Sequence, residues 1–204
     1  YSKRMGFCRL LLFLLVGETM KNKIISALED MPVIAAVRDR FFEKALNSPA
    51  SVIFLLGGDI STIGDKIRTA KEKGKFIFVH IDLTDGIGKD KSGLKFLYSL
   101  GADGILSTRG NLIKFAKEIG FITIQRFFVY DSYGVNGIED MVNNTKPDFI
   151  EIMPGLIDKI TARFSKGITP LIAGGLIETK QEITNALNSG AFAVSTGKEE
   201  LWNM

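Results

Sequence analysis

The chain has 204 residues, of which 46% are hydrophobic and 24% are charged, with a formal net charge of +3. This composition excludes a disordered or fibrous chain and fits one globular domain with a full hydrophobic core. The only cysteine, Cys8, lies close to the N-terminus, so the rest of the chain can form no disulfide and no thiolate metal site. We therefore expect a protein of a reducing cytoplasm.

Residues 1–19 differ from everything that follows them. Basic residues flank an apolar run at positions 10–16, as in a signal peptide, but the run is too short to span a bilayer and no cleavage pattern follows. We expect residues 1–19 to be a non-native leader or the product of an upstream start, with native translation beginning at Met20. The single domain then comprises residues 20–204 and carries one of the three net positive charges. Bulk charge thus gives no support for non-specific nucleic-acid binding, and we expect no membrane association.

From Met20 onward, short apolar runs alternate with longer amphipathic stretches. Most runs are apolar almost throughout, which is typical of parallel strands that are covered on both faces. The intervening stretches predict helices, and Thr179 and Glu182 have the spacing of a capping box. The eight runs are residues 33–38, 51–58, 76–83, 104–109, 121–129, 149–154, 170–177 and 191–198. The pattern predicts an α/β fold, a compact eight-stranded parallel β/α (TIM) barrel, rather than an open doubly wound sheet.

The segment after the eighth run is too short for a full closing helix. Two elements could cover the patch that this leaves bare: the amphipathic stretch at residues 22–31, or a second subunit. Under the second alternative the protein is a homodimer.

The seventh and eighth runs contain small residues where their strands should end, at Gly174-Gly175 and at Ser195-Thr196-Gly197. In a β/α barrel, the ends of these two strands commonly form a phosphate site. Glycines let backbone N–H groups approach an anion closely, and the neighbouring hydroxyls can add hydrogen bonds. The alternative is that the glycines only make a tight turn. If they bind phosphate, we expect Gly175→Asp to abolish ligand binding while leaving the fold largely intact.

Charged and polar side chains occupy strand positions that an apolar core would not choose. Because side chains alternate along a strand, Gln125 and Arg126 must point to opposite sides, whereas His80 and Asp82 share a face. A buried charge needs a partner, so these groups could also form a salt-bridge layer inside the barrel without any role in binding. His80, the only histidine, could be a general base, a ligand contact or a structural group. We expect polar ligand contacts from Arg38, His80, Asp82, Arg126 and Glu151, and no metal site.

Six segments in register resemble the glycerol-3-phosphate responsive antiterminator family: HIDLTDGIGKD, GILSTR, TIQRFFVYDS, PDFIEIMPG, PLIAGGLI and AVSTGKEELW. The resemblance runs from Val33 to Trp202, essentially the whole domain. One departure is conservative, because Val194 stands where the family usually has isoleucine.

The resemblance implies a cytoplasmic bacterial regulator of glycerol catabolism. Such a protein binds glycerol 3-phosphate as effector ligand, without a cofactor, and then binds the leader of a target messenger RNA. A terminator hairpin is thereby prevented and transcription continues. The implied fold is a β/α barrel that has kept a phosphate site without a demonstrated reaction. The resemblance does not indicate which residues touch RNA.

Two other functions would use the same pocket. The chain could be an enzyme acting on a small phosphorylated polyol, with His80, Asp82 or Glu151 as acid and base, although no second basic titrating group or metal cluster accompanies them. It could also be a metabolite-binding barrel that signals through a protein partner. For RNA binding, a local basic run is available, although a solvated helix face is an alternative role for it. The run comprises Lys66, Arg68, Lys71, Lys73 and Lys75.

Overall fold

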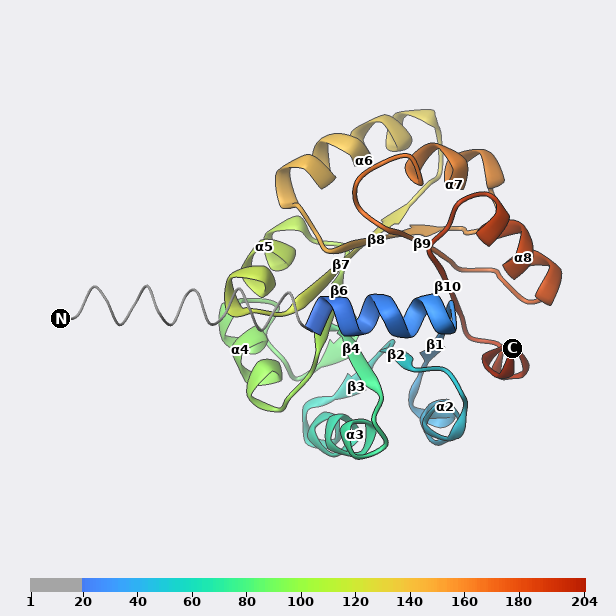
Figure 1. Cartoon of the computed structure of the whole chain (residues 1–204). Helices are drawn as coiled ribbons and strands as arrows, with labels where there is room; N and C mark the ends of the chain where they lie inside the picture. Colours follow the sequence, from blue (N-terminus) through green and yellow to red (C-terminus); the bar gives the residue numbers. More distant parts are fainter. Residues whose placement is uncertain (1–19) are drawn as a thin grey trace.

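A computed structural model describes residues 20–204. Eight parallel strands close into a barrel in the order β1-β10-β9-β8-β7-β6-β4-β2, which confirms the predicted TIM barrel (Figure 1). Every barrel strand falls within one of the eight apolar runs. The strands are β1 (Val33–Val37), β2 (Val52–Leu55), β4 (Phe76–His80), β6 (Gly104–Ser107), β7 (Ile122–Phe128), β8 (Phe149–Met153), β9 (Leu171–Gly174) and β10 (Ala193–Thr196).

Helices surround the barrel and cover the outer face of its strands (Figure 1). The α-helices are α2 (Phe42–Asn47), α3 (Ile60–Glu72), α4 (Lys91–Ser99), α5 (Gly110–Ile119), α6 (Ser132–Thr145), α7 (Asp158–Phe164) and α8 (Lys180–Asn188). Three short 3-10 helices are η1 (Asp39–Phe41), η2 (Ile81–Leu83) and η3 (Glu199–Asn203). The predicted capping box is present, since Thr179 and Glu182 bond each other's backbone N–H at the start of α8. None of the described helices is long and apolar enough to cross a membrane.

The strands are apolar on both faces because each face packs against a different layer. Ile34, Phe54 and Phe149 belong to a cluster inside the barrel. Their neighbours in sequence, such as Ala35 and Ile53, belong to the cluster between the strands and the surrounding helices. This double burial explains the near-continuous hydrophobic runs.

The N-terminal helix, residues 20–30, closes the N-terminal end of the barrel (Figure 1). Ile24 and Leu28 are 1% and 2% exposed and pack on the cluster inside the barrel. Lys21 Nζ lies 3.2 Å from Asp148 Oδ1, immediately before β8 begins. Of the two alternatives for covering the patch left by the missing final helix, residues 22–31 do not do so, because this helix caps an end of the barrel rather than a side.

That patch is covered instead by η3, which follows β10 directly. Leu201 and Trp202 are buried in the cluster between strands and helices. The indole Nε1 of Trp202 donates to the carbonyl oxygen of Thr196 at 2.9 Å. A single short 3-10 helix thus takes the place of the eighth peripheral helix. The expectation about residues 1–19 lies outside the described residues.

A small second sheet stands above the C-terminal end of the barrel. It pairs β3 (Gly58–Asp59) with β5 (Thr84–Asp85) in parallel. These two strands follow β2 and β4, so they extend that side of the barrel wall beyond its rim.

Candidate ligand-binding site

A small cavity opens at the C-terminal ends of the last two barrel strands, where the glycines and hydroxyls gather. Its volume is about 110 Å³, and five of the ten predicted site residues line it: Arg126, Gly175, Ser195, Thr196 and Gly197. The other residues of its wall are Ala36, Leu56, Met153, Leu176 and Ile177. The structure therefore brings β7, β9 and β10 together at one point, although these strands are far apart in sequence.

The turn after β9 holds two consecutive residues in the left-handed region. Gly175 has φ +76°, and Leu176 has φ +62° although it is not glycine. A Cβ at position 175 would lie 2.5 Å from Met153 Cε. Met153 could move its flexible end aside, so position 175 favours glycine chiefly for its left-handed conformation. Gly175→Asp would strain the turn, contrary to the expectation that it leaves the fold largely intact.

Glycine is needed at position 174 for a different reason. A side chain there would point towards buried polar groups inside the barrel. A Cβ at position 174 would lie 2.5 Å from both Glu151 Oε1 and Ser195 Oγ. Those two atoms form a buried hydrogen bond of 2.6 Å, with the hydroxyl donating. Gly174 thus makes room for a polar interaction beneath the cavity, whereas Gly175 shapes the cavity itself.

Arg126 and Glu151 form an ion pair inside the barrel. Arg126 Nε donates to Glu151 Oε2 at 2.6 Å, and the side chains are 6% and 0% exposed. The residues lie side by side in the register of β7 and β8. Gln125 points outward and accepts a hydrogen bond from Thr145, which confirms that neighbours in β7 face opposite sides. Each charge satisfies the other, and Arg126 also reaches the cavity wall.

The two hydroxyls at the end of β10 are already occupied. Ser195 donates to Glu151, while Thr196 Oγ1 donates to the carbonyl oxygen of Ile177 at 2.7 Å. Thr196 Oγ1 also accepts from the backbone N–H of Lys198. These side chains hold the two loops in place. The polar groups that remain for an anion in the cavity are the main-chain amides of its glycine-rich wall and the guanidinium of Arg126.

His80 is buried at the end of β4, with 3% of its surface exposed. Its Nδ1 lies 3.9 Å from Asp82 Oδ2 and makes no hydrogen bond within the described residues. Burial, and secondly the positive charge of Arg126, lowers the pKa of His80 from 6.5 to about 4. The imidazole is therefore neutral at pH 7, as a desolvated base should be.

Asp82 secures the neighbouring strand end. Its Oδ2 accepts from Ser107 Oγ at 3.0 Å and from the backbone N–H of Thr108 at 2.8 Å. Neither Asp82 nor His80 is part of the cavity wall. Within residues 20–204, no three His, Cys, Asp or Glu side chains gather as a metal site requires.

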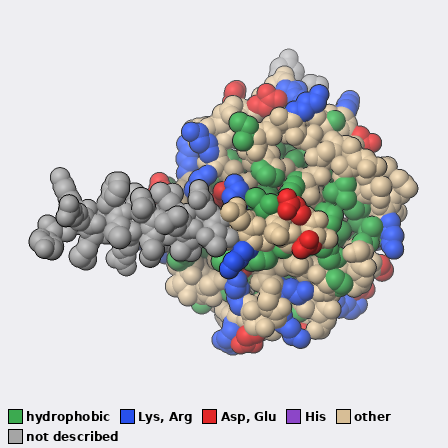
Figure 2. Space-filling view, in the orientation of Figure 1, with side chains coloured by type: hydrophobic (Ala, Val, Ile, Leu, Met, Phe, Trp, Pro, Cys, Tyr) green, Lys and Arg blue, Asp and Glu red, His purple; other side chains and the backbone are tan. Residues whose placement is uncertain are grey.

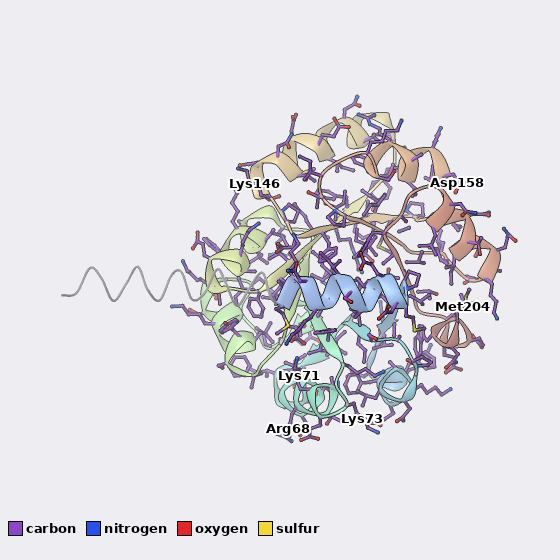
Figure 3. The ribbon with its side chains drawn as sticks, viewed as in Figure 1. Arg68, Lys71, Lys73, Lys146, Asp158 and Met204 are labelled. Carbon is purple, nitrogen blue, oxygen red and sulfur yellow. The ribbon has the colours of Figure 1, made fainter. Side chains whose placement is uncertain are left out.

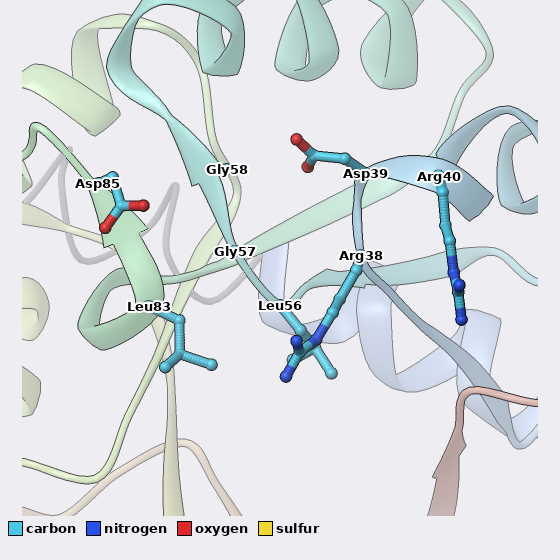
Figure 4. A pocket seen from close by; sticks show the side chains of 8 residues that line it. All are labelled: Arg38, Asp39, Arg40, Leu56, Gly57, Gly58, Leu83 and Asp85. Carbon is cyan, nitrogen blue, oxygen red and sulfur yellow. The ribbon is translucent and has the colours of Figure 1, made fainter.

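A larger and more open cavity, of about 630 Å³, adjoins the small one, and Leu56 lines both. The predicted ligand contact Arg38 lines this larger cavity and not the small one. Figure 4 shows Arg38 and Arg40 extending in the same direction, away from the carboxylate of Asp39. Asp39 is paired with Lys66 at 2.7 Å, so its charge is balanced elsewhere.

The sequence reasoning missed most of this larger cavity. Gly57 and Gly58 in its wall have φ +136° and +132°. They form a glycine pair at the end of the second apolar run, and Gly174 and Gly175 form a similar pair in the seventh. A glycine pair at a strand end therefore marked this cavity in the sequence as well. The remaining wall residues are Asp39, Arg40, Leu83 and Asp85.

The basic run, which lies on α3 and in the segment just after it, does not form a free cationic patch. Figure 3 labels three of its residues, Arg68 and Lys71 on α3 and Lys73 just after the helix ends. Ion pairs join Lys66 to Asp39, Arg68 to Asp65 and Lys71 to Asp103, and Lys75 donates to the carbonyl oxygens of Ser48 and Ala50. Figure 2 shows Lys and Arg interspersed with Asp and Glu on the face that carries the N-terminal helix. The run behaves as a helix surface whose charges are mostly paired.

The fold and cavity define a class: a β/α barrel whose last two strands end in a small, glycine-walled, arginine-lined pocket. Within that class, the chain belongs to the glycerol-3-phosphate responsive antiterminator family, whose model matches residues 33–202. This agrees with the resemblance seen in the sequence.

Three known proteins are similar to the chain over most of its length. It is 36% identical, over 89% of its length and 96% of the relative's, to the uncharacterized protein YgcP of Escherichia coli. A crystal structure of the glycerol uptake operon antiterminator regulatory protein from Listeria monocytogenes has a TM-score of 0.80 at 34% identity, covering 84% of this chain and 95% of that one. A glycerol uptake operon antiterminator-related protein from Thermotoga maritima has a TM-score of 0.77 at 30% identity, covering 84% and 98%.

Proposed function

We propose that the protein is a glycerol-3-phosphate-sensing transcription antiterminator of the cytoplasm. In this proposal it binds the leader of a messenger RNA for glycerol catabolism and prevents a terminator hairpin. The observation that carries the proposal is the small cavity at the ends of β9 and β10, at the position where β/α barrels commonly bind phosphate. Membership of the glycerol-3-phosphate responsive antiterminator family supports the choice of ligand and the regulatory role.

The phosphate group docks in the small cavity. Main-chain amides beside Gly175 and Gly197 approach its oxygens, and Arg126 contributes a guanidinium from below. A cavity of about 110 Å³ suits the phosphate group, while the glycerol hydroxyls extend past Leu56 towards Arg38 in the larger cavity. Glu151 balances Arg126 when the ligand is absent, because an unpaired buried charge would be strongly destabilising.

His80 and Asp82 support this site rather than react. His80 is neutral at pH 7 and lies near Arg126, whose charge helps to lower the pKa of the imidazole. Asp82 is bonded to the end of β6 and fixes the strand next to β7. We assign the protein a regulatory role without catalysis, and its effector is a ligand, not a cofactor.

Ligand control of RNA binding requires two states with different ligand affinities. The ligand must bind the RNA-competent state more tightly, and RNA must then raise the affinity for the ligand by the same factor. We propose the turn at Gly175 and Leu176 as the element that differs between the two states, because left-handed backbone at a non-glycine residue persists only when its surroundings impose it.

In-vitro transcription of a glycerol-operon leader tests this function. With the purified protein present, glycerol 3-phosphate should increase the fraction of transcripts that read through the terminator. Glycerol and inorganic phosphate, added separately as controls, should not. Read-through that is independent of both protein and ligand would contradict the proposal.

A further inference from the structure

Two exposed aromatic rings stack on each other just beyond the ligand cavity. Phe128 ends β7 and is 43% exposed, and Tyr130 follows it and is 88% exposed. Their ring centroids are 6.1 Å apart, with an interplanar angle of 20°. A stacked pair with this exposure presents an open aromatic surface to solvent, at the end of the barrel where the ligand cavity lies.

This aromatic platform, Phe128 and Tyr130, is connected to the cavity through the backbone. Phe128 lies opposite Met153 in the register of β7 and β8, and the N–H of Val129 donates to the carbonyl oxygen of Met153 at 2.8 Å. Met153 lines the cavity, and so does Arg126, which lies two residues before Phe128 on the same strand. A ligand in the cavity would therefore contact β7, from which the platform projects, and β8, which is paired with β7.

The charge distribution restricts how RNA can be bound. The domain is nearly neutral, and the basic run on α3 is mostly engaged in ion pairs and backbone contacts. Capture of phosphates by a broad basic surface is thus a weak source of affinity for this chain. Stacking of unpaired bases on aromatic rings does not depend on such a surface, and it is the usual way in which proteins recognise single-stranded RNA.

Further apolar side chains are exposed at the same end of the barrel. Leu83, Leu156 and Leu176 follow β4, β8 and β9, and their exposed fractions are 46%, 40% and 70%. They extend the apolar surface around the cavity mouth. Large exposed apolar residues that gather at one end of a fold are typical of a binding face.

We propose that an unpaired base of single-stranded RNA stacks on the platform formed by Phe128 and Tyr130. The ligand in the cavity fixes β7 and β8 through Arg126 and Met153, and so presents the platform in its binding conformation. This inference rests on the proposed function and adds to it a contact surface and a route from ligand to RNA.

Fluorescence anisotropy with a labelled glycerol-operon leader RNA, at saturating glycerol 3-phosphate, tests the inference. Tyr130→Ala should weaken RNA binding by about 5- to 150-fold, the range found when a stacking aromatic is replaced by alanine. Tyr130→Phe keeps the ring and should bind RNA about as well as the unmodified chain. Phe96→Ala is the matched control. It removes an aromatic side chain on α4 that is 38% exposed and lies outside the platform, and it should leave RNA binding unchanged.

Two further measurements distinguish failure of the platform from failure of the proposed antiterminator function. Ligand affinity, measured by calorimetry, should be unchanged in Tyr130→Ala, and the plot of log affinity against log salt should have a slope shallower than about −2. Equal RNA affinity of Tyr130→Ala and the unmodified chain would overturn the platform alone. Failure of the unmodified chain to bind the leader RNA would overturn the proposed function as well. Conversion of a dimer to a monomer by Tyr130→Ala, in sedimentation, would assign the platform to a second copy of the chain and overturn the inference.

Discussion

Adjacent glycines at the end of β9 serve different physical purposes. Gly174 leaves space for the Glu151–Ser195 hydrogen bond, whereas Gly175 adopts a left-handed backbone beside Met153. Gly197 differs from both, because a Cβ there would meet only the carbonyl oxygen of Ala36, at an ordinary contact distance of 3.5 Å. Gly197 is therefore the glycine in the cavity wall that can be replaced without straining the fold.

Replacement of Gly197 should separate ligand binding from folding. Gly197→Asp places a carboxylate in the cavity, and we expect the affinity for glycerol 3-phosphate to fall at least about 10-fold because like charges are brought together. Gly197→Asn has nearly the same size without the charge and is the matched control. Calorimetry that finds Asp and Asn variants equal in affinity would contradict a phosphate site here.

The buried ion pair should be costly to break from one side. Glu151→Ala leaves Arg126 without its carboxylate and Ser195 without its acceptor, and we expect a loss of about 3–5 kcal/mol in the free energy of unfolding. The double variant Arg126→Met, Glu151→Met should recover much of that loss while abolishing ligand binding. Urea denaturation measures the stability of the two variants and calorimetry their ligand affinity; a double variant no more stable than Glu151→Ala would contradict the expected cost of the unpaired charge.

His80 should make stability depend on pH. Its pKa is lowered from 6.5 to about 4 in the folded state, so between these values the unfolded chain binds more protons than the folded one. The stabilising contribution is complete above pH 6.5 and is lost as the pH falls towards 4, up to about 3 kcal/mol. Urea denaturation between pH 7.5 and 4.5 should show a smaller decrease for His80→Asn than for the unmodified chain; parallel curves would argue against a neutral buried imidazole.

At the scale of elements, the N-terminal helix closes the barrel opposite the ligand end. Leu28→Ala should lower the free energy of unfolding by about 2–5 kcal/mol, because the side chain is 2% exposed within the inner cluster. Glu29→Ala changes an exposed residue on the same helix and should have little effect. If the two variants were equally stable, the helix would not be packed on the barrel in solution.

Sequence patterns predicted some elements well and others poorly, for physical reasons. The strands were predictable because burial on both faces gives each of them a distinct apolar run. The inward direction of Arg126 was partly predictable, because side chains alternate along a strand and Arg126 must point to the side opposite Gln125. The place of the N-terminal helix was not predictable, because an amphipathic pattern defines an apolar face and not the surface that covers it.

The candidate site was predictable to the extent that it depends on strand ends. Gly175, Ser195 and Gly197 meet at one cavity because neighbouring parallel strands end at the same edge. The occupation of the hydroxyls of Ser195 and Thr196 by structural hydrogen bonds was not predictable, since it depends on contacts distant in sequence. The sequence left open whether the basic run was a patch or a solvated helix face, because its carboxylate partners Asp39 and Asp103 come from other elements.

At the scale of the whole molecule, the two ends of the barrel have separate tasks. The N-terminal end is sealed by a helix and contributes stability, while the C-terminal end holds both cavities and the exposed aromatic platform. This division is the usual one in β/α barrels. In our proposal, ligand and RNA would therefore both bind at the C-terminal end of the barrel.

A phosphorus NMR titration of glycerol 3-phosphate with the full chain, followed over hours, tests the central claim most directly. We predict a resonance that shifts or broadens as protein is added, with no new peak, and that is restored towards its free position in Gly197→Asp. A new phosphorus peak would show turnover and identify an enzyme. An unchanged resonance would show that the cavity does not bind this ligand and would contradict the account.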